Sequence, residues 1–200
     1  MNDKEIMDIE NRYLANVFSK KPVVFTKGKG ALLWDINGRE YLDCASSYGV
    51  AALGHCHPKI VAAIHAQADQ LITLHSCYYN DKRAEFTEKL VKITPKGLDK
   101  AFLSNSGAES VECAIKLARK ATGKPEIIAL MGSYHGKTMG ALSATWDKKY
   151  REPFMPLIPE IKHVAPDNPA KVSEAITEKT AAVLMEPIRG EGGIRVPPEG

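Results

Sequence analysis

The 200-residue sequence lacks the features that mark membrane, disulfide-bonded and nucleic-acid-binding proteins. No apolar run approaches the roughly 20 residues that a membrane-spanning helix needs. The four cysteines are far apart and form no CxxC pair, which argues against a zinc ribbon or disulfide framework and favours reduced thiols. The 27 basic and 24 acidic residues are interspersed, so the net charge of +3 creates no basic face. The charged N-terminus is not a signal peptide, and we expect a soluble cytoplasmic protein that acts on small molecules.

Several nucleotide-binding and hydrolase motifs are also absent. The sequence contains neither GxGxxG nor GxxxxGK[ST], and it has no GxSxG nucleophile elbow. His55 and His57 flank Cys56, but no second cluster of ligands accompanies them, so we predict capping and loop anchoring in place of a metal site. The sequence therefore argues against a dinucleotide enzyme, a P-loop enzyme and a serine hydrolase.

The segment Leu103 to Ser110 passes from a short apolar run into a strongly helical one. Ser106 is the expected N-cap, and Glu109 three residues later completes a capping-box pattern. The N–H groups of Gly107 and Ala108 would then face outward at the positive end of the helix dipole, where an anion can bind. An ordinary capped helix explains the same pattern, because helices commonly begin this way.

The first part of the chain predicts a helix over residues 4–18 and an antiparallel hairpin over 22–43 that turns at Asn37-Gly38. Helices are expected over 59–71, with Ile60, Ile64 and Leu71 inward, and over 82–93, with Phe86, Leu90 and Val91 inward. We expect residues 1–55 to form an N-terminal helix and hairpin segment, and residues 56–200 the first part of a larger, incomplete domain.

After Leu98 the pattern becomes strand, polar loop and helix, and it repeats. Strands are predicted over 101–103, 127–130, 161–164 and 181–185, with a further helix over 171–177. This alternation indicates an α/β fold with a mostly parallel, doubly wound sheet. Ligands bind beyond the carboxyl ends of such strands, and those ends carry residues 106–108, Tyr134-His135 and Glu186.

These three loops suit a planar phosphorylated cofactor. The helix start would hold the phosphate, the ring of Tyr134 would lie against a flat ring, and Glu186 supplies a carboxylate. His135 could act as an acid or base, but Tyr134 offers the more specific contact.

Four motifs, in order along the chain, resemble those of the class III pyridoxal-phosphate aminotransferases. They are Leu53-Gly54-His55-Cys56-His57-Pro58, Asn105-Ser106-Gly107-Ala108-Glu109 with the helix after it, Ser133-Tyr134-His135-Gly136-Lys137-Thr138, and Glu186-Pro187-Ile188-Arg189-Gly190-Glu191-Gly192-Gly193. Within that family, residues 79–86 and 149–154 look most like the acetylornithine and carrier-protein-linked lysine or ornithine aminotransferases. The resemblance implies a fold type I aminotransferase.

Carried over by position, the resemblance implies cofactor contacts for Ser106, Gly107, Ala108, Tyr134 and Glu186. It implies substrate contacts for three further residues, Tyr48, Lys137 and Glu191. Lys137 stands where acetylornithine enzymes usually have an Arg, which a Lys does not replace as a bidentate partner of a carboxylate. Arg189 stands where Gln is usual.

The implied reaction transfers the terminal amino group of acetylornithine, or of carrier-linked lysine or ornithine, to 2-oxoglutarate in arginine or lysine biosynthesis. Family members are homodimers. The alternatives are an ornithine or 4-aminobutyrate aminotransferase, and a non-catalytic chain that keeps only the fold and dimer surface. The family's Schiff-base Lys, and the Asp that pairs with the pyridine nitrogen, fall beyond Gly200. We therefore assign no catalytic residue here and expect these 200 residues alone to be inactive.

Overall fold

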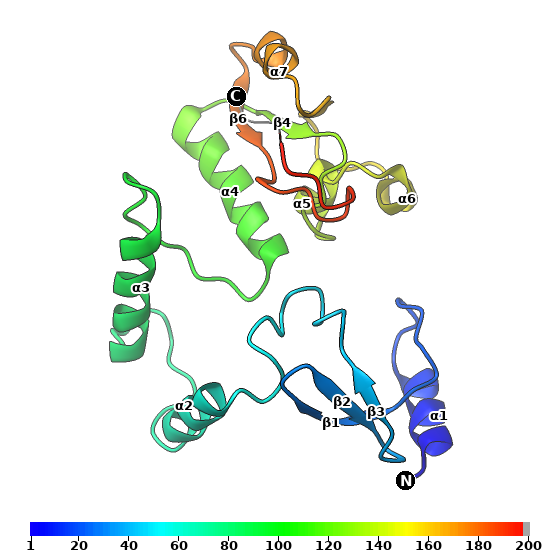
Figure 1. The fold of residues 1–200 in the computed structure, drawn as a ribbon. Helices are drawn as coiled ribbons and strands as arrows, with labels where there is room; N and C mark the ends of the chain where they lie inside the picture. Colours follow the sequence, from blue (N-terminus) through cyan, green and yellow to red (C-terminus); the bar gives the residue numbers. More distant parts are fainter. Residues whose placement is uncertain (198–200) are drawn as a thin grey trace. The chain divides into compact units, whose positions relative to one another are not determined.

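The computed structural model describes residues 1–197, and the chain divides into two compact units, Met1–Ala84 and Glu85–Gly200 (Figure 1). The N-terminal unit holds α1 (Asp3–Tyr13), β1 (Phe25–Lys29), β2 (Leu32–Asp35), β3 (Glu40–Leu42), α2 (Pro58–Ala68) and the start of α3 (Asp81–Ile93). The C-terminal unit continues with α4 (Gly107–Thr122), β4 (Glu126–Leu130), α5 (Met139–Ala144), α6 (Lys148–Arg151), η1 (Glu152–Phe154), β5 (Ile161–Val164), α7 (Pro169–Ala175) and β6 (Thr180–Leu184).

Helix α1 is shorter than the predicted helix over residues 4–18. It begins with a capping box, in which the Asn2 side chain accepts from the Glu5 N–H and the Glu5 carboxylate accepts from the Asn2 N–H. It ends at Tyr13, and Leu14 is already extended. Residues 16–18 are Asn, Val and Phe, which are weak helix formers, so the apolar spacing alone overestimated the helix.

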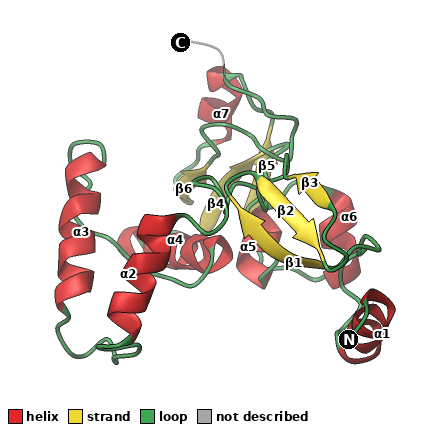
Figure 2. Ribbon diagram, turned by 60° about the horizontal axis from the view of Figure 1, so that its bottom comes forward, coloured by secondary structure: helices red, strands yellow, loops and turns green. Residues whose placement is uncertain are grey.

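The predicted hairpin is present as a three-stranded antiparallel sheet in the order β1, β2, β3 (Figure 2). The turn after β2 is held by Asp35, whose Oδ1 accepts from the N–H groups of Asn37 and Arg39 at 2.9 Å. Gly38 has a φ of 82°, a left-handed conformation that favours glycine. The Asn37-Gly38 turn therefore lies where the sequence predicts it.

The faces predicted to point inward on α2 and α3 are largely exposed. Ile60 and Ile64 on α2, Leu71 after it and Phe86 on α3 all keep more than a third of their surface exposed, whereas Leu90 and Val91 are half-buried. Helical periodicity identifies the apolar side of a helix but does not identify what covers it. The inward positions predicted for these four residues are wrong for the described chain.

The C-terminal unit is built on a parallel sheet in the order β5, β4, β6. Every residue of the central strand β4 is buried, as expected for a strand with neighbours on both edges. Helices α4 and α5 contact each other and pack on β6 and β5 respectively, while α7 lies on the opposite side of the sheet (Figure 1). This arrangement confirms the α/β class and the doubly wound, parallel sheet.

The apolar run over residues 101–103 is not a strand. Its residues are exposed and pair with no strand among residues 1–197. A strand is defined by its partner as much as by its own sequence, and three apolar residues alone cannot indicate whether a partner exists. The other strands, β4, β5 and β6, agree with the prediction to within one residue.

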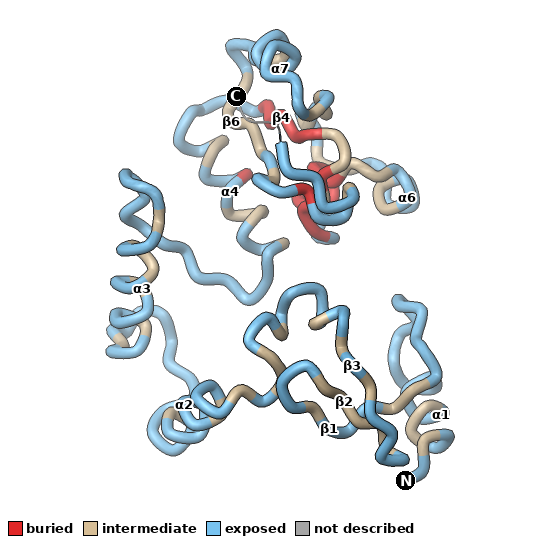
Figure 3. The backbone as a smooth tube through the Cα atoms, viewed as in Figure 1, coloured by how far each residue is buried: buried red, intermediate tan, exposed pale blue. Residues whose placement is uncertain are grey.

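The hydrophobic core lies in the C-terminal unit. Figure 3 shows the buried segments concentrated along β4 and α5. The fully buried apolar residues within the described chain are Ile115, Ile127, Ile128, Ala129, Leu130, Ala141, Leu142 and Ala144. The core thus sits under the loops that follow β4 and β6, and it fixes the backbone from which those loops start.

Candidate functional site

Helix α4 begins with two outward N–H groups, as its sequence predicts. Ser106 is the N-cap, and its Oγ accepts from the Glu109 N–H at 3.2 Å. The Glu109 carboxylate accepts from the Asn105 N–H at 2.6 Å, one residue beyond the position that a capping box would use. Within residues 1–197 the N–H groups of Gly107 and Ala108 have no acceptor. The end of a 16-residue helix therefore offers two donors and a positive dipole to an anion.

Residues 132–136, which we call the Tyr134 loop, follow β4 and pack directly on this helix start. A Cβ built on Gly136 would lie 2.7 Å from the Cβ of Ala108, and Gly136 has a φ of 132°. The neighbouring His135 N–H donates to Thr145 Oγ1 at 2.9 Å. Only a residue without a side chain allows the loop to approach α4 this closely.

The ring of Tyr134 is held edge-on to Tyr150 of α6, with 5.7 Å between the ring centroids and an interplanar angle of 75°. Partial burial, with smaller contributions from Tyr150 and Glu191, raises the pKa of the Tyr134 hydroxyl above its usual value. Both rings line a cavity of about 410 Å³ together with Trp146, Lys149 and Glu191. Tyr134 is thus a fixed, half-buried aromatic surface in the same unit as the helix start.

Glu186 fastens the Tyr134 loop to the end of the sheet. Its Oε1 accepts from the Tyr134 N–H at 2.8 Å, and its Oε2 accepts from the Gly190 N–H at 3.1 Å. The residue follows β6, one position after Met185, as predicted from the abrupt end of that apolar run. In the structure its carboxylate orients two backbone segments, and a direct contact with a cofactor stays a prediction.

The three predicted substrate residues differ in their surroundings, and Glu191 is the one that lies beside Tyr134 within the C-terminal unit. Glu191 lines the same cavity as Tyr134. Lys137 is exposed just before Thr138, the N-cap of α5. Tyr48 belongs to the N-terminal unit, where its side chain is 97% exposed on a loop with left-handed backbone at residues 46–48.

Sequence reasoning missed Glu112, which joins α4 to α5. Its Oε1 accepts from the N–H groups of Gly140 at 2.7 Å and Ala141 at 3.2 Å. Burial opposes ionisation, but the hydrogen bonds from Thr138, Ala141 and Gly140 prevail and lower the pKa of this carboxyl. No local sequence pattern indicates this role, because its partners in α5 lie 28 and 29 positions further along the chain.

His135 is buried, and its Nε2 has no hydrogen-bond partner among the described residues. Burial lowers the pKa of this imidazole and favours its neutral form, while the Glu186 carboxylate acts in the opposite direction. The sequence indicated only that His135 follows Tyr134. Its side chain is more deeply buried than that of Tyr134, and the choice of Tyr134 as the cofactor contact stays a prediction.

The predicted anchoring role of the first histidine motif is confirmed. His57 accepts from the Lys59 N–H as the cap of α2, and Pro58 is the first residue of that helix. His55 Nε2 lies 2.7 Å from Asp43 Oδ2. Within residues 1–197 no cluster of three or more metal-ligating side chains occurs, and no helix is long and apolar enough to cross a membrane.

A helix N-terminus and polar loops at the carboxyl ends of a parallel sheet are where α/β proteins bind phosphorylated ligands, and the fold is that of the fold type I aminotransferases. The sequence profile described as "Aminotransferase class-III" matches residues 13–200. The chain belongs to this family, whose members depend on pyridoxal phosphate.

Two curated relatives and one solved structure illustrate the similarity. Acetylornithine aminotransferase of Methanopyrus kandleri is 49% identical over 200 residues, which are 100% of this chain and 51% of that protein. [LysW]-aminoadipate semialdehyde transaminase of Deinococcus radiodurans is 45% identical over 97% of this chain and 46% of its own length. The crystal structure of ornithine aminotransferase from Toxoplasma gondii ME49 superposes with a TM-score of 0.90 at 31% identity, covering 99% of this chain and 48% of that one. The chain spans about half the length of these relatives.

Proposed function

We propose that this chain contributes the phosphate-binding and ring-stacking part of a pyridoxal-phosphate aminotransferase. The observation that carries the proposal is the close packing of Gly136 on Ala108, which holds the Tyr134 loop against the first turn of α4, where the N–H groups of Gly107 and Ala108 have no acceptor in the described chain. The N–H groups of Gly107 and Ala108, with the Ser106 cap, would hold the phosphate, and the Tyr134 ring would lie against the pyridine ring. Bound there, the cofactor supplies the electron sink for amino transfer.

The chain's own groups would then bind, orient and shield. The helix dipole of α4 favours the charged phosphate without a lysine or arginine at its start. Glu186 fixes the Tyr134 backbone, so the angle of the stacking ring is set before the cofactor binds. The buried residues of β4 and α5 beneath the loop exclude water from that side.

The cofactor site is tested by replacing Tyr134 with Ala in the full-length protein. Pyridoxal phosphate binding is followed by the fluorescence of Trp146, which lines the same cavity as Tyr134. We expect about tenfold weaker binding, because the stacking surface is lost. Tyr13→Ala, at an exposed ring on α1, is the matched control and should bind normally. Equal affinity of Tyr134→Ala and the unaltered protein would contradict the proposed site.

As amino donor we propose acetylornithine, or lysine or ornithine linked to a carrier protein, with 2-oxoglutarate as acceptor. The support is the names of the relatives in Methanopyrus kandleri and Deinococcus radiodurans. Lys137 and Glu191 are the proposed substrate contacts in the C-terminal unit and Tyr48 in the N-terminal one. Comparing the three donors settles the substrate, and Lys137→Arg should shift preference toward acetylornithine, because the guanidinium binds a carboxylate in bidentate fashion. An unchanged donor preference would contradict the role of Lys137.

Ornithine aminotransferase is the second candidate, favoured by Tyr48 and by the superposition on the Toxoplasma gondii structure. If free ornithine is the preferred amino donor, ornithine aminotransferase is selected.

We further propose a cytoplasmic homodimer in which residues 1–55 form a segment apart from the domain that begins at residue 56. Free cysteines at positions 44, 56, 77 and 113 support a reducing location, and sedimentation of the full-length protein tests the dimer.

A further inference from the structure

Residues 186–195, which we call the Glu191 loop, form a turn closed by its own backbone. Arg189 and Arg195 exchange two N–H···O bonds of 3.0 Å, and the N–H groups of Gly193 and Ile194 both donate to the Gly190 carbonyl at 3.1 Å. Near its end the side chain of Ile194 is 75% exposed. These local bonds shape the loop but do not fix its position on the sheet.

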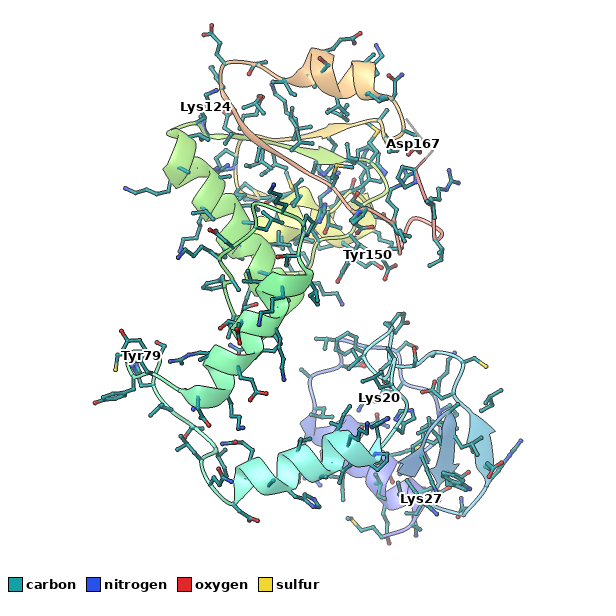
Figure 4. The ribbon with its side chains drawn as sticks, turned by 60° about the vertical axis from the view of Figure 1, so that its left-hand side comes forward. Lys20, Lys27, Tyr79, Lys124, Tyr150 and Asp167 are labelled. Atoms are coloured by element: carbon teal, nitrogen blue, oxygen red, sulfur yellow. The ribbon has the colours of Figure 1, made fainter. Side chains whose placement is uncertain are left out.

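Arg189 is the one residue of this loop that is fully buried, with 6% of its surface exposed. Its Nη2 donates to Asp167 Oδ2 at 2.5 Å, across to the loop between β5 and α7. Figure 4 shows Asp167 beside the segment that leads to the C-terminal end of the described chain. A guanidinium stays charged at any pH that a protein tolerates, so burying it requires an acceptor at this place.

The Glu191 loop also lies directly on the Tyr134 loop. A Cβ built on Gly192 would lie 2.6 Å from the Gly132 carbonyl oxygen, so the two backbones are in close contact. Glu186 accepts from N–H groups in both loops, those of Tyr134 and Gly190. A displacement of the Glu191 loop would therefore change the distance between the Glu191 carboxylate and the Tyr134 ring.

We propose that the Arg189–Asp167 ion pair is a positioning device for Glu191. The pair anchors the Glu191 loop to the β5–α7 loop, and this anchor sets where Glu191 stands beside Tyr134. Both residues act through the loop, and neither needs to touch substrate or cofactor. The consequence for substrate handling rests on the proposed aminotransferase function, whereas the anchoring itself does not.

The test uses hydrogen–deuterium exchange on the full-length protein without added substrate. The variants are Arg189→Gln, Asp167→Asn and the double variant, and Arg195→Gln is the control because it removes an exposed charge from the same loop. In each single variant we expect amides of residues 190–195 to exchange about tenfold faster while those of β4 are unchanged. The double variant should exchange no faster than the faster single one, because both changes break the same pair.

Three results would overturn the proposal: unchanged exchange in the loop, additive effects in the double variant, or an equal acceleration throughout β4. The last would mean that the pair stabilises the unit as a whole. At position 189 the class III aminotransferases usually have Gln, so we expect the Arg189→Gln variant to fold.

A kinetic arm tests the consequence for substrates. In Arg189→Gln we expect KM for one of the two substrates to rise about fivefold with kcat changed less than twofold, because loop position affects binding of the substrate that Glu191 faces. A fall in kcat alone would contradict positioning by the loop. If the unaltered protein transfers no amino group, the proposed function fails while the exchange result still decides the anchor.

Discussion

The two units differ in how much of their apolar surface they bury. Within the described residues, all fully buried hydrophobic side chains belong to the C-terminal unit, while α1 and α2 bury none (Figure 3). The C-terminal unit has a sheet with helices on both sides, which covers a core. The N-terminal unit has a three-stranded sheet whose residues are at most half-buried.

This difference distinguishes apolar residues that are buried in a core from apolar residues that remain exposed. Tyr48, Tyr79, Val50 and Ile72 are each more than four-fifths exposed and lie in the N-terminal unit. Large apolar side chains that stay exposed are candidates for contacts with another surface. In the C-terminal unit, by contrast, the loops around the candidate site are held by backbone N–H groups that donate to the side chains of Glu186, Thr145 and Glu112.

The largest expected effect comes from the core. Ile128→Ala at the centre of β4 should lower the free energy of unfolding by about 3 kcal/mol, because it removes a fully buried side chain and leaves a cavity. Ile64→Ala on α2, where the side chain is 60% exposed, should cost less than about 1 kcal/mol. Urea unfolding of the full-length protein measures both. Comparable losses would show that Ile64 is buried in the native assembly, which would end the contrast between the units.

Two glycines sharpen the comparison at the site. Gly136→Ala should weaken pyridoxal phosphate binding at least tenfold, because the new methyl group overlaps Ala108 and pushes the Tyr134 loop away from α4. Gly38→Ala in the N-terminal unit has a similar left-handed strain and meets open space, so binding should be unchanged. Tryptophan fluorescence titration compares them, and equal losses would mean that backbone strain, and not the overlap, weakens binding.

The helix caps of the two units should contribute differently. Ser106→Ala removes the cap of α4, which packs on β6, and should lower global stability by about 1 kcal/mol. Asn2→Ala removes an equivalent cap from α1, which has no buried residue, and should cause local fraying alone. Thermal unfolding measures the global loss of stability in Ser106→Ala, and amide hydrogen exchange measures the local fraying of α1 in Asn2→Ala. A global loss for Asn2→Ala would show that α1 is packed in the native protein.

The smallest expected effect is on acid stability. Glu126 is buried at the start of β4, where the ammonium of Lys162 and the hydroxyl of Thr180 lower the pKa of its carboxyl against the opposing effect of burial. Because the folded pKa is depressed, the stabilisation is present above the unfolded Glu pKa of about 4.3 and is lost as pH falls toward the folded value.

Glu126→Gln should therefore flatten the decline of the urea midpoint below about pH 4.3, whereas Glu178→Gln at an exposed position should leave the decline as it is. An identical acid slope in Glu126→Gln and the unaltered protein would show that Glu126 does not titrate with an altered pKa in the folded state.

The sequence predicted the C-terminal unit better than the N-terminal one for a physical reason. The buried strand β4 is recognisable in the sequence as an unbroken apolar run over residues 127–130, and capped helices such as α4 begin at recognisable residues. The run over residues 101–103 and the apolar face of α2 contain similar apolar residues, but these residues are exposed.

Within the candidate site, the residues proposed to contact the cofactor were chosen from local sequence pattern, whereas most of the residues that hold them could not be. Ser106, Gly107 and Tyr134 follow from local pattern, because caps and loop aromatics depend on neighbours in sequence. The Glu112 bonds to α5 and the Arg189–Asp167 pair join residues more than twenty positions apart. No local pattern encodes such pairs, since either partner alone looks like a solvated charge.

Helix α4 appears in two opposite electrostatic roles. At its own N-terminus it presents two N–H groups to a negative charge, and one turn further along it lends the negative charge of Glu112 to the first N–H groups of α5. Lys137 lies immediately before that junction. A natural variant at position 112 would therefore look, in a substrate screen, like a change of specificity at Lys137, although neither Lys137 nor any other proposed substrate contact had been altered.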